Sequence, residues 1–156
     1  MELTTVSQKI VDYLKLHAIP HQSIHHAAAA SVVEYQRTMG TRLTQQAKAL
    51  FVRYKKHSEK GFAIVAIQAQ KKLDLDVVCK LLHAREVRLG TPEQLEQATG
   101  CNYGELPPLG KFFSLKLLMD KDLLQEDKIF FNAGSLTFSI VLNPEMLVAL
   151  EEPILF

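Results

Sequence analysis

One loop in the second half of the chain has the composition of a ligand-binding segment. Residues 100–110 read GCNYGELPPLG, with three glycines and two adjacent prolines. Glycine lets a ligand approach the main chain, while each proline fixes φ at about −65° and removes an N–H donor. The donors that remain belong to Gly104, Glu105, Leu106, Leu109 and Gly110. Such a loop is bent and stiff, and the residues alone leave open whether it lines a site or is a rigid connector.

A single lysine is the second candidate for chemistry. Lys48 lies between Ala47 and Ala49, where a polar segment gives way to a predicted strand, whereas other lysines occur in exposed groups. An ammonium at such a boundary either extends to solvent along an apolar surface or points into a cleft. In a cleft it would act as a compact point charge. Taken alone, the position favours the solvent-exposed alternative.

The other reactive side chains form no familiar catalytic or metal-binding pattern. Three histidines recur every four residues, namely His17, His21 and His25. On one helix they could bind a metal, but Pro20 breaks that helix. Cys79 and Cys101 have no CxxC partner, so we expect structural thiols. Because the P-loop, G-x-G-x-x-G and G-x-S-x-G patterns are also absent, the sequence predicts no metal and no cofactor.

The hydrophobic pattern predicts helices and strands in an α+β order. Helices are expected over 4–17, 28–39, 75–83, 91–100 and from 144 onwards, with a brief helical turn over 43–48. Strands are expected over 21–26, 49–54, 62–69, 86–89, 128–132 and 136–142. The segment 62–69 is apolar enough to be a central strand buried on both faces. Strands and helices do not alternate strictly, so a mixed, strongly curved sheet with surrounding helices is favoured over a doubly wound one.

Length, charge and hydropathy indicate one cytoplasmic domain. We expect a single domain over residues 1–156, a usual length for one core. The formal net charge of +1 gives no global attraction for polyanions, so contact with nucleic acid would depend on a local patch. Charged residues interrupt the N-terminal segment where a signal peptide is apolar, and no run approaches the ~18 apolar residues of a membrane span. We therefore expect no interaction with a membrane.

Lys48 and the glycine-rich loop together resemble a known family. The segments AKALFV at 47–52, TGCNYGELPPLG at 99–110 and FNAGS at 131–135 carry the resemblance. They are similar in order, spacing and length to the free-standing aminoacyl-tRNA deacylases of the YbaK/ProX family, which are related to the editing domain of bacterial prolyl-tRNA synthetase. The match covers nearly the whole chain, and the loop paired with the lysine at this separation is its most specific part.

The resemblance implies a fold, a reaction and a set of site residues. The fold is a compact α+β domain whose mixed, barrel-like sheet surrounds one pocket. The reaction is hydrolysis of the ester that joins a wrong amino acid to the terminal ribose of tRNA, with help from the 2′-hydroxyl of that ribose. Lys48 matches the pocket lysine of the family and is the expected catalytic residue. The residues expected to bind substrate are Gly104, Gly110, Gly134 and Ser135.

An aminoacyl ester is already activated, so backbone N–H groups that stabilise the oxyanion could suffice without a His–Asp base. Because a synthetase distinguishes one methylene by only ~1–3 kcal/mol, we expect a pocket for a small amino acid such as alanine, serine or cysteine. The acceptor end of the tRNA would be held through phosphates. The candidates on a predicted hairpin are Arg53, Lys55, Lys56 and Lys60, with an ordinary solvated loop as the alternative.

Other functions remain open at this stage. Many members of the family have Asn or Thr after the pocket lysine, whereas this chain has Ala49. This departure favours an alternative in which the same fold binds tRNA or an aminoacyl-tRNA synthetase with reduced catalysis. A further alternative is hydrolysis of another small ester or amide in the same pocket. The residues leave open which amino acid and tRNA are edited, and the oligomeric state.

Overall fold

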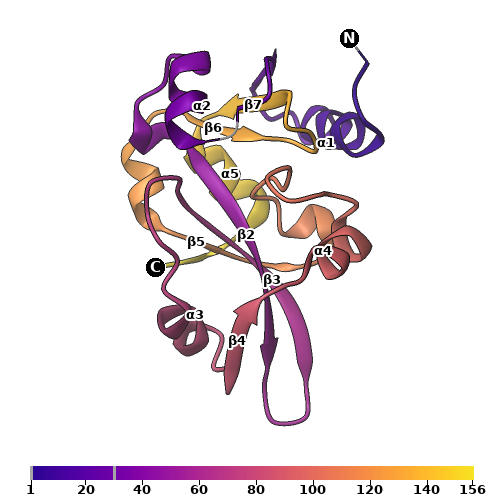
Figure 1. Cartoon of the computed structure of the whole chain (residues 1–156), viewed down its shortest axis with the longest axis vertical. Helices are drawn as coiled ribbons and strands as arrows, with labels where there is room; N and C mark the ends of the chain where they lie inside the picture. Colours follow the sequence, from indigo (N-terminus) through magenta and orange to yellow (C-terminus); the bar gives the residue numbers. More distant parts are fainter. Residues whose placement is uncertain (1, 30) are drawn as a thin grey trace.

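The computed structural model describes residues 2–29 and 31–156 and confirms the α+β class (Figure 1). The helices are α1 (Thr5–Leu16), α2 (Val32–Met39), α3 (Leu75–Leu81), α4 (Pro92–Thr99) and α5 (Pro144–Glu151). The strands are β1 (Gln22–His25), β2 (Ala47–Lys55), β3 (Lys60–Gln68), β4 (Glu86–Leu89), β5 (Lys116–Met119), β6 (Ile129–Asn132), β7 (Phe138–Leu142) and β8 (Ile154–Leu155). Three 3₁₀ turns complete the list: η1 (Leu43–Gln45), η2 (Lys111–Phe113) and η3 (Lys121–Gln125).

The strands form two sheets, whereas the sequence suggested one barrel-like sheet. The larger sheet has the order β4-β2-β3-β5-β8 and is mixed, because β5 is parallel to β3 and to β8 while β2 is antiparallel to its neighbours. The smaller sheet, β1-β7-β6, is antiparallel. A single parallel bridge between Gln46 and Phe130 joins them. One pair of residues cannot continue a ladder, so among the described residues neither sheet closes into a barrel.

The central strand was predicted correctly. β3 is the middle strand of the larger sheet, and its residues 63–68 are buried, as a strand covered on both faces requires. Helix α3 packs on one face, where Val78 lies in the same apolar cluster as Val65. The opposite face contacts the main core, which contains Ile10 of α1 and Leu147 of α5. β3 is packed on both faces and pairs with β2 along its whole length, so the position of β2 is fixed.

Several element ends differ from the predicted ones. Helix α2 begins at Val32, after the cap residue Ser31, and not near residue 28; residue 30 of the predicted helix lies outside the described residues. The predicted helical turn ends at Gln45, because pairing of Ala47 with Gln68 begins β2 two residues earlier than expected. The cap signals themselves are confirmed in α1, α4 and α5. In the part of the chain that the structure describes, no helix is long and apolar enough to cross a membrane.

Candidate functional site

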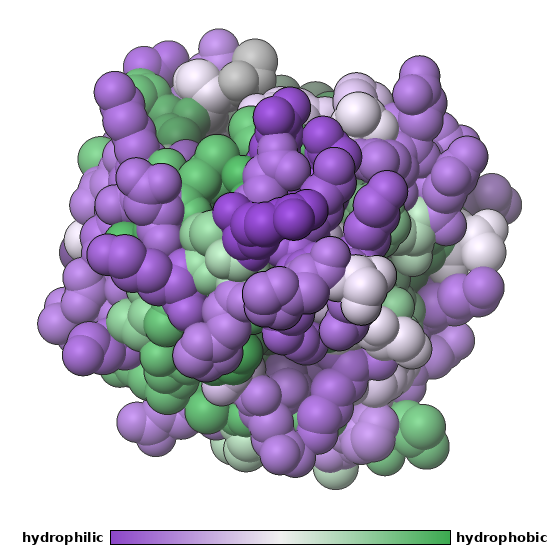
Figure 2. All heavy atoms as spheres, turned by 90° about the horizontal axis from the view of Figure 1, so that it is seen from below, coloured by the Kyte–Doolittle hydropathy of each residue, from purple (hydrophilic) through white to green (hydrophobic). Residues whose placement is uncertain are grey.

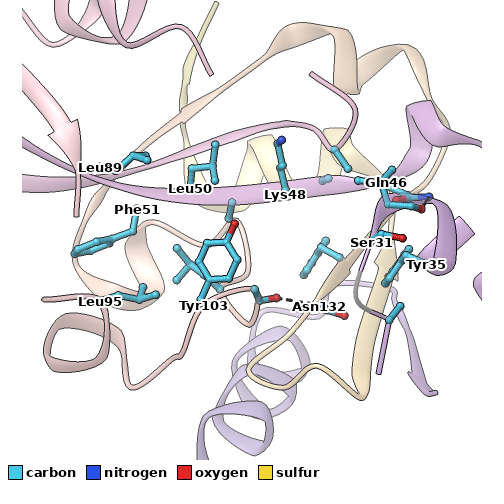
Figure 3. A pocket seen from close by; sticks show the side chains of 18 of the residues that line it. Ser31, Tyr35, Gln46, Lys48, Leu50, Phe51, Leu89, Leu95, Tyr103 and Asn132 are labelled. Atoms are coloured by element: carbon cyan, nitrogen blue, oxygen red, sulfur yellow. Dashed lines mark hydrogen bonds between the residues drawn. The ribbon is translucent and has the colours of Figure 1, made fainter. Parts of the chain in front are cut away.

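A cavity of about 400 Å³ opens beside the first half of β2 (Figure 3). Six parts of the chain line it. They are α2 with the residues before it (29, 31, 32 and 35), the start of β2 with the residue before it (46–51), the residue after β3 (69), the end of β4 with the start of α4 (89–92 and 95), the glycine-rich loop (103, 104 and 106), and β6 (130–132). The wall is largely apolar and the polar groups are few, as is usual for a small-molecule site.

The cavity exists because β2 is longer than its neighbour. β4 pairs with β2 only between Val52 and Lys55, and Gly90 N–H donates to the Phe51 carbonyl at 2.9 Å. Alternate residues of a strand direct their N–H and C=O groups to opposite edges. Since Phe51 and Lys55 bond toward β4, the N–H and C=O of Ala49 face that same edge, which is open beside the cavity. The main chain of β2 therefore offers one donor and one acceptor there.

Lys48 lines the cavity and is half-buried. Burial lowers the pKa of its ammonium, and no described residue accepts a hydrogen bond from Nζ or forms an ion pair with it. Figure 3 shows Lys48 and Leu50 pointing to one side of β2, while Phe51 and Tyr103 lie on the other. The ammonium and the loop thus flank the open strand edge, and a ligand lying along this edge would contact both.

The exposed half of the glycine-rich loop reaches the cavity at Tyr103 and Gly104. Two of its carbonyl groups accept hydrogen bonds. Asn132 Nδ2 donates to the Gly104 oxygen at 3.1 Å, and Gly134 N–H donates to the Glu105 oxygen at 2.8 Å. Because these bonds occupy the Gly104 and Glu105 carbonyl oxygens and not the neighbouring N–H groups, N–H donors of the loop remain for a ligand.

Two of the five predicted loop donors are left for a ligand at the cavity wall. The Glu105 and Leu109 N–H groups bond within the loop, and Gly110 is buried outside the cavity lining. Gly104 and Leu106 line the cavity, and among the described residues neither of their N–H groups finds an acceptor. These two amides are the donors that the loop can present.

Three other predicted site residues lie away from the cavity wall. A Cβ at Gly110 would approach the Leu115 oxygen to 2.7 Å, and a Cβ at Gly134 would approach the Ser7 nitrogen to 2.9 Å, so both glycines permit close packing. The hydroxyl of Ser135 bonds to Thr137 within the β6–β7 turn. A direct role in substrate binding stays a prediction for these three residues.

Sequence reasoning missed several lining residues. Asn132 is a polar residue at the end of an apolar strand, a signal that could have identified it. Tyr35 offered no signal, because it occupies an ordinary apolar position of α2. Tyr103 is 83% exposed, and its place at the rim depends on the path of the loop. Residues 89–92 come from a connection whose position follows from the pairing of β4 with β2.

A second, smaller cleft of about 170 Å³ is lined by residues of β2, β3, β4 and α4. Its cationic lining residues are Arg53, Lys55, Lys60 and Arg88. Arg53 and Arg88 are cross-strand neighbours, and Glu86 forms ion pairs with Lys55 and Arg88. Lys56 lies outside this lining, with Nζ 6.0 Å from the Tyr54 ring centroid. Seen from the hairpin end, the surface consists mostly of hydrophilic side chains (Figure 2).

No metal centre accompanies either cleft. Across residues 2–29 and 31–156, no group of three or more His, Cys, Asp or Glu side chains is placed to hold a metal ion. Both cysteines are free, with Cys101 buried in the core.

The chain is similar to known proteins of tRNA editing. Residues 26–150 match the family described as the aminoacyl-tRNA editing domain. The Escherichia coli K12 protein named multifunctional Ser/Thr-tRNA deacylase ProXp-y is 27% identical over 147 residues, which cover 94% of this chain and 88% of the relative.

Two solved structures share the fold. A crystal structure of a candidate trans-editing enzyme for prolyl-tRNA synthetase superposes with a TM-score of 0.83 at 21% identity, covering 99% of this chain and 97% of that one. A protein from a study of epitope grafting onto designed scaffolds gives a TM-score of 0.84 at 20% identity, with the same coverage. At these identities the structural likeness concerns the fold alone.

Proposed function

Since the chain belongs to the aminoacyl-tRNA editing domain family, it is a hydrolase of mischarged aminoacyl-tRNA, and we propose that its substrate carries a small amino acid bound beside β2. The observation that carries this proposal is the shared cavity: an ammonium without a partner among the described residues and two unbonded loop amides border one open strand edge. The relative named as a Ser/Thr-tRNA deacylase supports a small, hydroxylated amino acid.

The loop amides provide electrostatic stabilisation for ester hydrolysis. Water adds to the ester carbonyl carbon as it loses a proton, and the carbonyl oxygen becomes an oxyanion. The carbonyl then re-forms, the bond to the ribose oxygen breaks, and that oxygen takes up the proton to leave as the ribose hydroxyl. We assign the Gly104 and Leu106 N–H groups to this oxyanion, because both line the cavity and lack acceptors. A single preorganised donor of this kind contributes roughly 3–4 kcal/mol in known hydrolases. The rigid prolines and the pinned carbonyls keep both donors in place without a reorganisation cost.

Lys48 and the edge of β2 orient the substrate from the other side. The ammonium is a compact point charge, and we assign it to the terminal ribose or its phosphate, close to the oxygen that leaves. The carbonyl of Ala49 faces the open edge, where it can accept a hydrogen bond from the α-ammonium of the aminoacyl group. Ala49 thus binds through its main chain, so the absence of an Asn or Thr side chain at this position does not by itself remove activity.

The second cleft is suited to the phosphates of the acceptor end. β2 and β4 border both hollows: Phe51 and Leu89 line the cavity, whereas Arg53 and Arg88 line the cleft. A single-stranded tRNA end that leaves the cavity along β2 and β4 would reach the cationic side chains of the cleft. Glu86 pairs with two of them, Lys55 and Arg88, and so neutralises the cleft only in part. Of the hairpin candidates Arg53, Lys55, Lys56 and Lys60, the cleft supports all except Lys56, and it adds Arg88.

Salt dependence tests the cleft. Arg53→Ala and Arg88→Ala are each expected to lower kcat/KM for aminoacyl-tRNA and to reduce the dependence of log K on log salt by about 0.7 per lost contact. Hydrolysis of a free aminoacyl ester, which has no phosphates, should be unchanged. Lys80→Ala, at an exposed position of α3, is the matched control and should leave the salt dependence intact. A wild-type affinity that does not respond to salt would contradict phosphate binding in the cleft.

A panel of mischarged tRNAs tests the substrate. The protein is incubated with tRNAs carrying alanine, serine, threonine, cysteine or a large residue such as leucine, and release of the amino acid is followed. We expect release of small residues and no release of leucine. Protection of every ester from spontaneous hydrolysis would instead support the binding-only alternative, in which the protein serves a tRNA or synthetase complex. Cleavage of free aminoacyl esters as fast as the tRNA would indicate a general esterase.

A further inference from the structure

A chain of hydrogen bonds runs from the small sheet to the loop of the candidate site. Ser139 of β7 is fully buried, and its hydroxyl contacts His26 Nε2 at 2.7 Å and the Tyr35 hydroxyl at 2.8 Å. It also donates to Asn132 Oδ1 at 3.1 Å. The amide nitrogen of Asn132 in turn donates to the Gly104 carbonyl at 3.1 Å. The chain therefore connects α2 and the β6–β7 pair to the glycine-rich loop, along the wall of the cavity.

The chemistry of these groups fixes the direction of each bond near the loop. The Gly104 carbonyl can only accept, so Asn132 must present its NH₂ group to it. Its Oδ1 then faces Ser139, and since Oδ1 also can only accept, the Ser139 hydroxyl must donate. The reversed amide would place two acceptors, Asn132 Oδ1 and the Gly104 oxygen, against each other at the loop and lose that hydrogen bond.

Tyr35 and His26 complete the coordination of Ser139. A hydroxyl has one hydrogen and can accept two bonds, so a Ser139 that donates to Asn132 accepts from both other partners. Burial raises the pKa of Tyr35 to about 12, so its hydroxyl keeps the hydrogen that it donates. His26 Nδ1 lies 2.8 Å from the Ala27 carbonyl, which fixes the orientation of the ring beside Ser139.

We infer that Ser139 is a positioning residue for the hydrolysis: it selects the orientation of the Asn132 amide, and through it holds the Gly104 peptide so that the loop amides face the cavity. The inference rests on the proposed function for its catalytic consequence. Ser139 contacts no substrate, since it is absent from the cavity lining. Its removal frees the Asn132 amide to rotate, and the Gly104 peptide then loses the bond that fixes it.

A double-mutant cycle tests this assignment with aminoacyl-tRNA as substrate. Ser139→Ala and Asn132→Ala are each expected to lower kcat about fivefold to tenfold, the range of one neutral hydrogen bond, with a much smaller change in KM. The double variant should be no slower than Asn132→Ala alone, because Ser139 acts only through Asn132. Effects that multiply in the double variant would overturn the inference.

Val78→Ala is the control for a loss of stability away from the loop. Val78 of α3 is fully buried in the apolar cluster between α3 and the larger sheet, outside the cavity lining. It should lower Tm through the cavity that it leaves and leave kcat unchanged. If Ser139→Ala loses no more activity than Val78→Ala does at a comparable loss of Tm, Ser139 has only a structural role.

Amide hydrogen exchange tests the positioning step without relying on activity. The Glu105 N–H donates to the Asn102 oxygen within the loop, and its exchange reports loop order. We expect faster exchange in Ser139→Ala and wild-type exchange in Val78→Ala; equal exchange in all three proteins would contradict the inference. A wild-type protein that hydrolyses no aminoacyl-tRNA would refute the proposed function, and the exchange rates would still decide the role of Ser139.

Discussion

Gly104→Ala separates the strain of the glycine-rich loop from its role as an amide donor. Gly104 has φ +85°, a conformation that side chains rarely adopt, and an added Cβ would lie 3.0 Å from Leu136 Cδ2. Leu136 is 38% exposed and can move its side-chain end, so the contact adds little. The backbone cost of about 1–2 kcal/mol remains. For a chain of this length it corresponds to a fall in Tm of roughly 2–8 °C.

The functional cost should exceed the stability cost. Relief of strain at residue 104 rotates the peptides on either side, which displaces the N–H assigned to the oxyanion. We expect kcat for a mischarged tRNA to fall at least about tenfold, since loss of one such donor costs up to about 10²–10³. The assay is a single-turnover measurement of amino acid release at saturating enzyme, with thermal unfolding measured on the same samples.

Gly40→Ala is the control for backbone strain alone. Gly40 ends α2 with φ +67°, and nothing lies within 4 Å of its added Cβ. This variant should lose a similar amount of Tm and keep its kcat. The reasoning is refuted if Gly104→Ala loses no more activity than Gly40→Ala does at the same loss of stability.

Three further predictions concern ionisable groups. Burial raises the pKa of Glu151, whose Oε1 has no partner among the described residues although Tyr13 donates to Oε2. The folded state then holds a proton that the unfolded state releases above pH ~4.3, so urea unfolding should show stability falling as pH rises through the raised pKa, and Glu151→Gln should remove this loss. Burial raises the pKa of Cys101 to about 11; at pH 8 iodoacetamide should modify half-buried Cys79 in the native protein and leave Cys101 unmodified, which mass spectrometry can check. Because burial lowers the pKa of Lys48, kcat/KM should decline with rising pH below the ordinary lysine pKa of about 10.4, and a flat profile up to that pH would contradict a role for the ammonium.

Local sequence signals predicted most of the elements because caps and hydrophobic period act over a few residues. The Thr91 capping box and the Asn143 cap appear where the sequence placed them. The continuous apolar run at β3 predicted a central strand correctly. The early start of β2 was missed because Ala47 pairs with Gln68, which is distant in sequence. The start of α2 was missed although its signal is local, since the Ser31 hydroxyl caps the helix by accepting from the Glu34 N–H.

The division into two sheets, and with it most of the site, depended on long-range pairing. Nothing local indicates that Gln46 meets Phe130 by one bridge, or that β4 stops short of the first half of β2. The candidate lysine and the loop were found through the resemblance of their combined motifs. Asn132 and Ser139 could not be connected to the loop from sequence, because their bonds to it exist only after β6 and β7 pair.

The most direct test of the account compares wild type with Lys48→Ala and Lys48→Met on the best mischarged tRNA of the panel. Methionine keeps the length and much of the apolar stem of lysine without the charge, so it separates packing from electrostatics. We expect rapid amino acid release by wild type and a rate at least about a hundredfold lower in both variants. This loss is comparable to that caused by removing a preorganised charge-stabilising group. Deacylation by either variant within about twofold of wild type would contradict the central claim that the Lys48 ammonium and the loop amides form one catalytic cavity.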